Sequence, residues 1–322
     1  MSPVLVTGGN GYLGTQLIAA LLRDGREVRA TVRSAAREEG LREAVRRGGA
    51  DDAGLEVMTA DLMADDGWKA ATAGCEEIHH VATPFPAVQP DDPDELIRPA
   101  REGTLRVLRA ARDAGARRVV LTSSFAAIGY SPKATAEFDE NDWTDPDTPG
   151  LPPYPRSKAI AERAAWDFIH AEGGGTELAV VNPTFILGPT LVSELRSSVQ
   201  IVKVMLDGTL TTVRRQRFGL ADVRDVADLH IRAMAAPGAA GQRYLCLADG
   251  PTISFLRLAE ILKERTGPLG TKVNVEEEPG QDPPRLVIHN EKAKEELGFR
   301  PRSVETTIVE SAESLRDLGL LA

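Results

Sequence analysis

The sequence predicts an α/β protein: a doubly wound parallel sheet followed by a smaller carboxyl-terminal α/β lobe. Along the first half of the chain, short apolar runs alternate with amphipathic segments, as in a parallel sheet that helices cover. A glycine cluster at residues 7–14 separates the first apolar run from the first amphipathic segment. The length of 322 residues allows one large domain or two modest ones.

Five near-continuously apolar runs are expected to be strands buried on both faces. They are residues 3–7, 27–33, 55–60, 77–82 and 117–123. Helices are expected at 13–23, 93–114, 155–172, 193–206, 226–235, 255–265 and 304–318, with further strands at 178–182 and 218–223. Residues 132–153, rich in Pro, Asp, Thr and Gly, predict a long surface excursion. We expect a domain of residues 1–182, to which 218–246 return, and a lobe of residues 183–322.

Charge and cysteine content exclude several classes of protein. The 38 basic and 48 acidic side chains give a net charge of −10, which repels nucleic acid and anionic membrane surfaces. The two cysteines, Cys75 and Cys246, have no metal-ligand spacing and support no disulfide scaffold. The sequence shows no leader signature and no membrane-spanning apolar stretch, so a cytoplasmic protein is expected.

The glycine cluster reads Thr7-Gly8-Gly9-Asn10-Gly11-Tyr12-Leu13-Gly14. Glycines after a strand permit a tight turn and let backbone amides approach a pyrophosphate, whose charge a helix N-terminus stabilises. The alternative is a turn without a ligand. Because a predicted strand precedes the cluster and a predicted helix follows it, we favour a dinucleotide site of the Rossmann type.

Arg33 stands where NAD-binding folds usually place an acidic residue for the ribose 2′-hydroxyl. No carboxylate follows until Glu38. An arginine here can pair with a 2′-phosphate, so the sequence predicts NADPH rather than NADH. A solvated surface charge is the alternative for Arg33, and equally for Arg37, which could assist it.

Tyr154 and Lys158 are four residues apart in a predicted helix and therefore share one face. A nearby ammonium lowers the pKa of a phenol, so this spacing favours an acid–base role for the tyrosine. The alternative is a tyrosine at a helix start beside Pro155. Ser124 directly follows the fifth predicted strand, where ligands meet the carboxyl edge of an open sheet. Serines also end strands for turn reasons.

Taken together, these motifs resemble the extended short-chain dehydrogenase/reductases over nearly the whole chain. The segments that carry the resemblance include the glycine cluster, Arg33, Asp61-Leu62, Val81-Ala82-Thr83-Pro84, Thr122-Ser123-Ser124, Tyr154 with Lys158, and Asn182-Pro183-Thr184. The chain is most similar to the branch of dihydroflavonol reductases, cinnamoyl-CoA reductases and NADPH-dependent methylglyoxal and aldehyde reductases.

The resemblance implies a catalytic set of Ser124, Tyr154 and Lys158. Tyr154 would protonate the carbonyl oxygen, Lys158 would lower the tyrosine pKa and hold the nicotinamide ribose, and Ser124 would hydrogen-bond the substrate oxygen. The cofactor-binding residues it implies, besides Tyr154 and Lys158, are Gly8, Gly11, Tyr12, Leu13, Gly14, Arg33, Asp61, Leu62, Val81, Ala82, Thr83, Pro183 and Ile186.

Two departures from that branch narrow the substrate. Leu151-Pro152-Pro153 before Tyr154 argues against a CoA thioester, and Gly129, where dihydroflavonol reductases carry a polar side chain, argues against flavonoids. Four aromatic residues either wall an apolar substrate pocket or anchor core and loops: Phe85, Phe125, Tyr130 and Trp143. His79 and His80 adjoin on a predicted strand and point to opposite faces, so no metal site is expected.

The sequence therefore predicts an NADPH-dependent reductase that converts a modest-sized aldehyde or ketone into an alcohol. One alternative is an NAD-type nucleotide-sugar epimerase or dehydratase, which shares the tyrosine and lysine but which Arg33 disfavours. Another is a non-catalytic NADP-sensing regulator, which would need no tyrosine acid. The expected partner is a small-molecule carbonyl substrate, without nucleic acid or membrane, and the protein is expected to be a monomer or homodimer.

Overall fold

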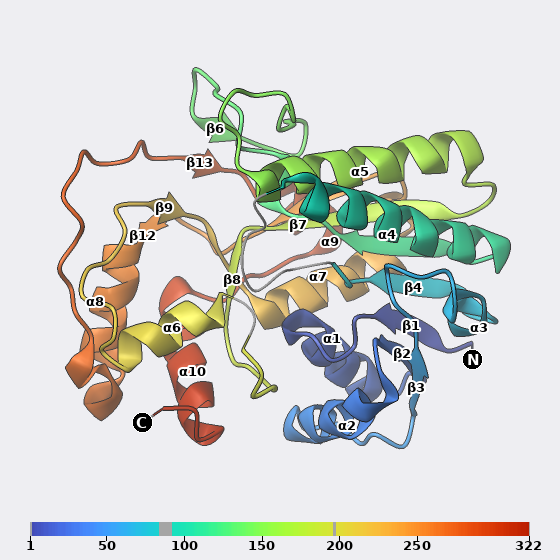
Figure 1. Ribbon diagram of the computed structural model, residues 1–322, viewed down its shortest axis with the longest axis horizontal. Helices are drawn as coiled ribbons and strands as arrows, with labels where there is room; N and C mark the ends of the chain where they lie inside the picture. Colours follow the sequence, from blue (N-terminus) through green and yellow to red (C-terminus); the bar gives the residue numbers. More distant parts are fainter. Residues whose placement is uncertain (1, 84–91, 196–197, 322) are drawn as a thin grey trace.

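A seven-stranded parallel sheet forms the centre of the molecule (Figure 1). The computed structural model describes residues 2–83, 92–195 and 198–321. The strands are β1 (Val4–Thr7), β2 (Val28–Val32), β3 (Leu55–Thr59), β4 (Glu77–His80), β5 (Arg118–Thr122), β7 (Glu177–Pro183) and β11 (Arg243–Cys246), in the order β11-β7-β5-β4-β1-β2-β3. The predicted doubly wound sheet is confirmed, and the five strands expected in the first half end within two residues of their predicted limits.

Helices cover both faces of the sheet. One face packs against α1 (Tyr12–Arg23), α2 (Glu38–Arg47), α7 (Val223–Ala235) and α9 (Glu291–Leu297). The other packs against α3 (Trp68–Thr72), α4 (Asp94–Asp113) and α5 (Pro153–Glu172). Strand residues alternate between the two cores: Val4 and Val6 enter the first and Leu5 the second. This period of two explains why successive residues are apolar in β1 and at Val119, Val120 and Leu121 of β5.

The carboxyl-terminal elements gather at one end of the sheet (Figure 1). They comprise α6 (Val199–Leu206), α8 (Phe255–Arg265), α10 (Val304–Asp317), the parallel pair β8 (Phe185–Leu187) and β10 (Leu220–Asp222), and the antiparallel pair β9 (Arg217–Phe218) and β12 (Ile253–Ser254). The 3-10 turns are η1 (Ala35–Arg37), η2 (Phe125–Ala127), η3 (Pro237–Ala239) and η4 (Gly267–Lys272). The helices α6, α8 and α10, together with β8, β10 and β12, share a separate hydrophobic core built around Leu187, Leu220 and Leu258.

Several ends in this half differ from the prediction. The expected helix at 193–206 begins only at Val199, whereas α7 begins earlier than expected because the Asp222 side chain caps it by accepting from the Arg224 amide. The expected strand at 218–223 is divided at Gly219, where a Cβ would stand 2.9 Å from Thr184 Cγ2. Although β11 follows these elements in sequence, it returns to the sheet beside β7. The division at residue 182 stays a prediction.

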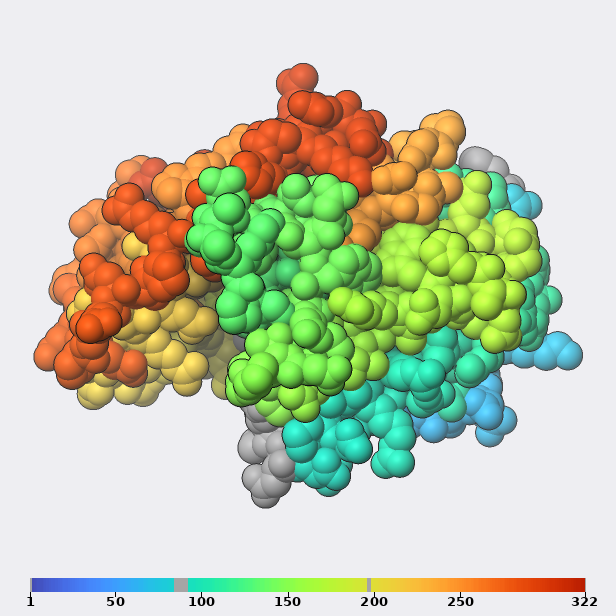
Figure 2. All heavy atoms as spheres, turned by 90° about the horizontal axis from the view of Figure 1, so that it is seen from above, coloured from blue at the N-terminus to red at the C-terminus, as the bar shows by residue number. Residues whose placement is uncertain are grey.

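A long excursion leaves the sheet between η2 and α5, as predicted for residues 132–153. Within it, β6 (Glu137–Phe138) pairs with β13 (Val287–Ile288) of the carboxyl-terminal chain. Figure 2 shows this green segment on the surface beside the orange-red segment. Across the described ranges, no helix has the length and apolar character that a membrane crossing requires.

Candidate active site

The glycine loop is folded so tightly that side chains are excluded at two positions. Gly8 has a φ of +69°, and a Cβ there would stand 2.9 Å from Ala82 Cα. A Cβ on Gly14 would stand 2.4 Å from the Gly8 carbonyl oxygen. Gly11, at the N-terminus of α1, provides no side-chain cap for the first-turn amides. The loop therefore presents an uncapped helix N-terminus at the carboxyl edge of the sheet, which suits a phosphate group.

Strand ends place the other predicted cofactor residues along the same edge. Thr7 Oγ1 accepts from the Val81 amide at 3.1 Å and the Ala82 amide at 3.0 Å, which ties the end of β4 to that of β1. Pro183 ends β7 in the buried interior, and Ile186 lies partly buried on β8.

Arg33 follows β2 directly, is exposed, and forms no ion pair within the described parts of the chain. The nearby Arg37 guanidinium is paired with the Glu194 carboxylate. An uncapped helix end beside an exposed arginine at the end of β2 fits a dinucleotide with a 2′-phosphate. Asp61, which Leu62 follows, stabilises a turn after β3. Its Oδ1 accepts a hydrogen bond from the Met63 amide at 2.9 Å.

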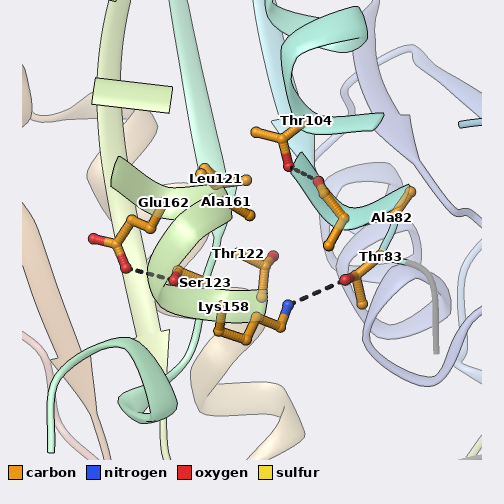
Figure 3. Close-up of a pocket in the computed structure, with 10 residues that line it drawn as sticks. Ala82, Thr83, Thr104, Leu121, Thr122, Ser123, Lys158, Ala161 and Glu162 are labelled. Atoms are coloured by element: carbon orange, nitrogen blue, oxygen red, sulfur yellow. Dashed lines mark hydrogen bonds between the residues drawn. The ribbon is translucent and has the colours of Figure 1, made fainter. Parts of the chain in front are cut away.

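Ser124, Tyr154 and Lys158 come together beside this edge. Ser124 follows β5, and its side chain shares a hydrogen bond with that of Tyr154. Lys158 Nζ lies 5.9 Å from the Tyr154 ring centroid and donates to Thr83 Oγ1 at 3.1 Å (Figure 3). The structure thus brings the three predicted catalytic side chains, and Thr83, into one site.

The electrostatics differ from the expectation that Lys158 lowers the tyrosine pKa. Burial raises the pKa of Tyr154, and the hydrogen bond from Ser124 opposes the rise. The ammonium of Lys158 donates to Thr83 Oγ1 and lies 5.9 Å from the centroid of the Tyr154 ring. Burial also lowers the pKa of Lys158 to about 8, against the influence of Glu162. At neutral pH the phenol is protonated and can act as a proton donor.

Residues 4–246 match the NAD dependent epimerase/dehydratase family. The chain belongs to this family. Cinnamoyl-CoA reductase 1 of Arabidopsis thaliana is 33% identical over 329 residues, covering 99% of this chain and 90% of the relative. An anthocyanidin reductase of Vitis vinifera is 32% identical over 335 residues, covering 98% of this chain and 96% of the relative.

Among solved structures, the yeast methylglyoxal/isovaleraldehyde reductase Gre2 complexed with NADPH is similar with a TM-score of 0.83 at 25% identity. The similarity covers 98% of this chain and 99% of that chain. The predicted resemblance to the reductase branch of the extended short-chain dehydrogenase/reductases is confirmed, as are the predictions of an oxidoreductase and of NADPH.

Of the four aromatic residues expected either to wall a substrate pocket or to anchor core and loops, Phe125 and Trp143 pack against other parts of the protein. Phe125 lies in a small core with Phe138, with ring centroids 5.8 Å apart. The Trp143 ring packs against the guanidinium groups of Arg243 and Arg163, whose carbon atoms lie 3.7 Å and 5.0 Å from the ring centroid, and so anchors the excursion. Tyr130 is 44% exposed beside Phe125, so it remains available to a substrate. Phe85 and Pro84 lie outside the described residues.

Packing also explains why residue 129 is a glycine. A Cβ at this position would stand 2.1 Å from Phe125 Cζ, and Phe125 is buried. A polar side chain that could contact a substrate therefore has no room here.

The two adjacent histidines are buried and contact different elements. His79 faces His230 of α7, with ring centroids 5.6 Å apart, whereas His80 Nδ1 is hydrogen-bonded to Thr7 Oγ1 at 2.9 Å. Burial lowers the pKa of His79 to about 4 and that of His80 to about 3. Within the described ranges, no group of three or more His, Cys, Asp or Glu is arranged to hold a metal ion.

Sequence reasoning missed two charged residues near the predicted catalytic residues, Glu162 and Arg243. They form a buried ion pair, with Arg243 Nε 2.6 Å from Glu162 Oε1. Glu162 follows Lys158 by four residues on α5, so helical spacing alone could have singled it out. Arg243 lies on a distant strand, and no local pattern connects it to the site.

Proposed function

We propose that this chain reduces the carbonyl group of a modest-sized aldehyde or ketone to an alcohol with NADPH. The observation that carries the proposal is the meeting of Ser124, Tyr154 and Lys158 beside the glycine loop. The chain is similar over nearly its whole length to proteins named as reductases, which supports the same class of reaction.

The residues around the sheet edge would hold the dinucleotide. The amides around Gly8, Gly11, Tyr12, Leu13 and Gly14 suit the pyrophosphate, and Arg33 suits the 2′-phosphate. Asp61 and Leu62 would border the adenine, Val81, Ala82 and Thr83 would line the cleft, and Pro183 and Ile186 would lie beside the nicotinamide. NADPH, when bound, supplies the hydride.

Tyr154 would donate the proton to the substrate oxygen. Its raised pKa keeps the phenol protonated at neutral pH. A placed general acid typically contributes about 10²–10⁴-fold to a rate. After the transfer the phenol oxygen carries negative charge, which the Lys158 ammonium near the ring stabilises.

Ser124 would orient the carbonyl. Its hydroxyl is hydrogen-bonded to Tyr154, so a carbonyl oxygen that enters between them can accept from both. Two donors aimed at one oxygen stabilise the charge that develops there. Lys158, hydrogen-bonded to Thr83, is placed to hold the ribose hydroxyls of the nicotinamide half.

Because a side chain at Gly129 would clash with Phe125, no polar group at this position can bind ring hydroxyls, which supports a substrate other than a flavonoid. We propose a cytoplasmic monomer or homodimer with a dinucleotide domain of residues 1–182, completed by 218–246, and a substrate lobe of residues 183–322. The free thiols of Cys75 and Cys246 support a reducing compartment.

Cofactor consumption with a panel of carbonyls tests the proposed function. The purified protein is mixed with NADPH or NADH and with aldehydes, α-dicarbonyls, β-ketoesters or aryl ketones, and absorbance is followed. We expect NADPH consumption with at least one aldehyde or ketone, at a higher kcat/KM than with NADH. Absence of NADPH-dependent turnover across the whole panel would contradict the proposal.

A further inference from the structure

The Glu162 carboxylate is the most completely bonded charged group near the site. The residue is only 1% exposed, and its two oxygens accept four hydrogen bonds. The donors are Ser123 after β5, Asn182 on β7, Arg243 on β11 and Trp166 on α5. Leaving a buried carboxylate without partners is costly, so these donors match what the charge requires.

The two oxygens of Glu162 face different parts of the molecule. Oε2 accepts from Ser123 Oγ at 2.5 Å and from Asn182 Nδ2 at 2.8 Å. Oε1 accepts from Arg243 Nε at 2.6 Å and from Trp166 Nε1 at 3.3 Å. One oxygen therefore contacts the strand ends at the site, and the other contacts groups away from it.

The Oε2 contacts hold Ser124 from both sides along the chain. Ser123 precedes it directly, and Asn182 Nδ2 also donates to the Ser124 carbonyl oxygen at 3.3 Å. Figure 3 shows the two hydrogen bonds of neighbouring α5 side chains, from Ser123 to Glu162 and from Lys158 to Thr83. We call the part of the site formed by Ser123, Ser124 and Asn182 the corner. Because charge-assisted hydrogen bonds are the stronger ones, the carboxylate fixes this corner better than a neutral acceptor would.

The Oε1 contacts extend to the surface excursion. Arg243 Nη1 donates to the carbonyl oxygens of Glu140 and Asp142, each at 2.8 Å. The same guanidinium packs on Trp143. Glu162 therefore connects the corner at Ser124 to the excursion.

Lys158 and Glu162 also share a small cavity of about 20 Å³. Within the described chain, the ionisable groups that act on or lie against Lys158 are Tyr154 and Glu162 on α5 and His80 on β4. His80 stays neutral because burial holds its pKa at about 3, so Glu162 provides the negative charge near the ammonium.

We propose that Glu162 is a positioning residue for the reduction, which fixes Ser124 against the substrate oxygen through Ser123 and Asn182 and balances the charge of Lys158. This inference rests on the proposed function. The carboxylate is buried and bonded to protein donors, so it acts through the residues proposed to contact substrate and cofactor.

Two conservative variants on opposite oxygens of the same carboxylate test the positioning. Ser123→Ala removes a donor from Oε2, and Trp166→Phe removes one from Oε1. We expect Ser123→Ala to lower kcat by about 10- to 100-fold, with the KM for NADPH unchanged, because small displacements at a reacting centre are costly. Trp166→Phe should keep the kcat of the unaltered protein. Equal kcat values for the two variants would overturn the proposal.

Glu162→Gln tests the charge. Losing the carboxylate lets burial lower the pKa of Lys158 further, so the basic limb of the kcat/KM profile should move to lower pH. Ser123→Ala, which keeps the charge, should leave this limb in place. A limb that does not move in Glu162→Gln would overturn the electrostatic part. Should Glu162→Gln fail to fold, Ser123→Ala and Trp166→Phe decide the proposal alone.

Tyr154→Phe, measured alongside, separates this inference from the proposed function. If Tyr154→Phe keeps its turnover, the proton-donor assignment fails. If Tyr154→Phe is inactive while Ser123→Ala matches Trp166→Phe, only the role of Glu162 fails.

Discussion

We propose that the preference for NADPH over NADH depends on the side chain of Arg33. It follows β2 as an exposed arginine, where a carboxylate would bind a ribose hydroxyl instead. We expect Arg33→Ala to raise the KM for NADPH by about 10- to 100-fold, because the charge-assisted hydrogen bonds to the 2′-phosphate are lost. The KM for NADH, which has no 2′-phosphate, should change less than about twofold. Steady-state kinetics with both cofactors measure this. Equal losses with both would show that Arg33 does not contact the 2′-phosphate.

The protonation of Lys158 sets a second expectation at this scale. Burial lowers its pKa to about 8, so the ammonium form is present below that pH and is lost as pH rises through it. Because kcat/KM reports the free enzyme, kcat/KM for NADPH should fall above pH 8. His79 and His80, with pKa values of about 4 and 3, should add no limb between pH 6 and 7. A profile that is flat up to pH 9.5 would contradict the assignment.

At the scale of the elements, the first turn of α1 packs closely against the glycine loop that follows β1. A Cβ on Gly14 would stand 2.4 Å from the Gly8 carbonyl oxygen, a backbone atom that cannot move freely. We expect Gly14→Ala to lower the free energy of unfolding by about 1–3 kcal/mol and to weaken NADPH binding. Gly40→Ala in α2 is the matched control. Nothing lies within 4 Å of its Cβ, so it should stabilise the protein by about 0.5–1 kcal/mol. Denaturant unfolding compares the two, and equal changes would contradict the close packing.

Elements whose signals are local could be predicted from the sequence. The strands of the first half are apolar on both faces, and α4 was expected within one residue of each observed end. Ends set by tertiary contacts could not. The start of α7 depends on the Asp222 cap, and the break between β9 and β10 depends on Thr184 approaching Gly219.

At the scale of the whole molecule, the fold connects the surface excursion and the segment after β8 to the edge of the sheet. The connection to the excursion exists because the chain returns to the sheet at β11. The strand β11 brings Arg243 beside α5 and the excursion, although 81 residues separate it from Glu162. Tyr12 of α1 donates to the Gly188 carbonyl oxygen at 2.7 Å, which ties the glycine loop to the segment after β8.

The motifs of the catalytic set could be read from the sequence, since each is a short pattern at a strand end or a helix start. The electrostatics could not, because they depend on burial and on neighbours from distant strands. From the spacing of Tyr154 and Lys158 we predicted that the pKa of Tyr154 is lowered, whereas burial raises this pKa. The bonds of Glu162 to Ser123, Asn182 and Arg243 likewise join elements that only the fold brings together.

Turnover by Tyr154→Phe with its NADPH affinity measured in parallel is the most direct test of proton donation by the phenol. The substitution removes one hydroxyl from a partly buried ring and leaves Lys158 and the glycine loop in place. We predict a fall in kcat of about 10²–10⁴-fold with a far smaller loss of NADPH affinity, because the other proposed cofactor-binding residues are unaltered. A variant that binds NADPH normally and reduces the carbonyl at the rate of the unaltered protein would contradict the account.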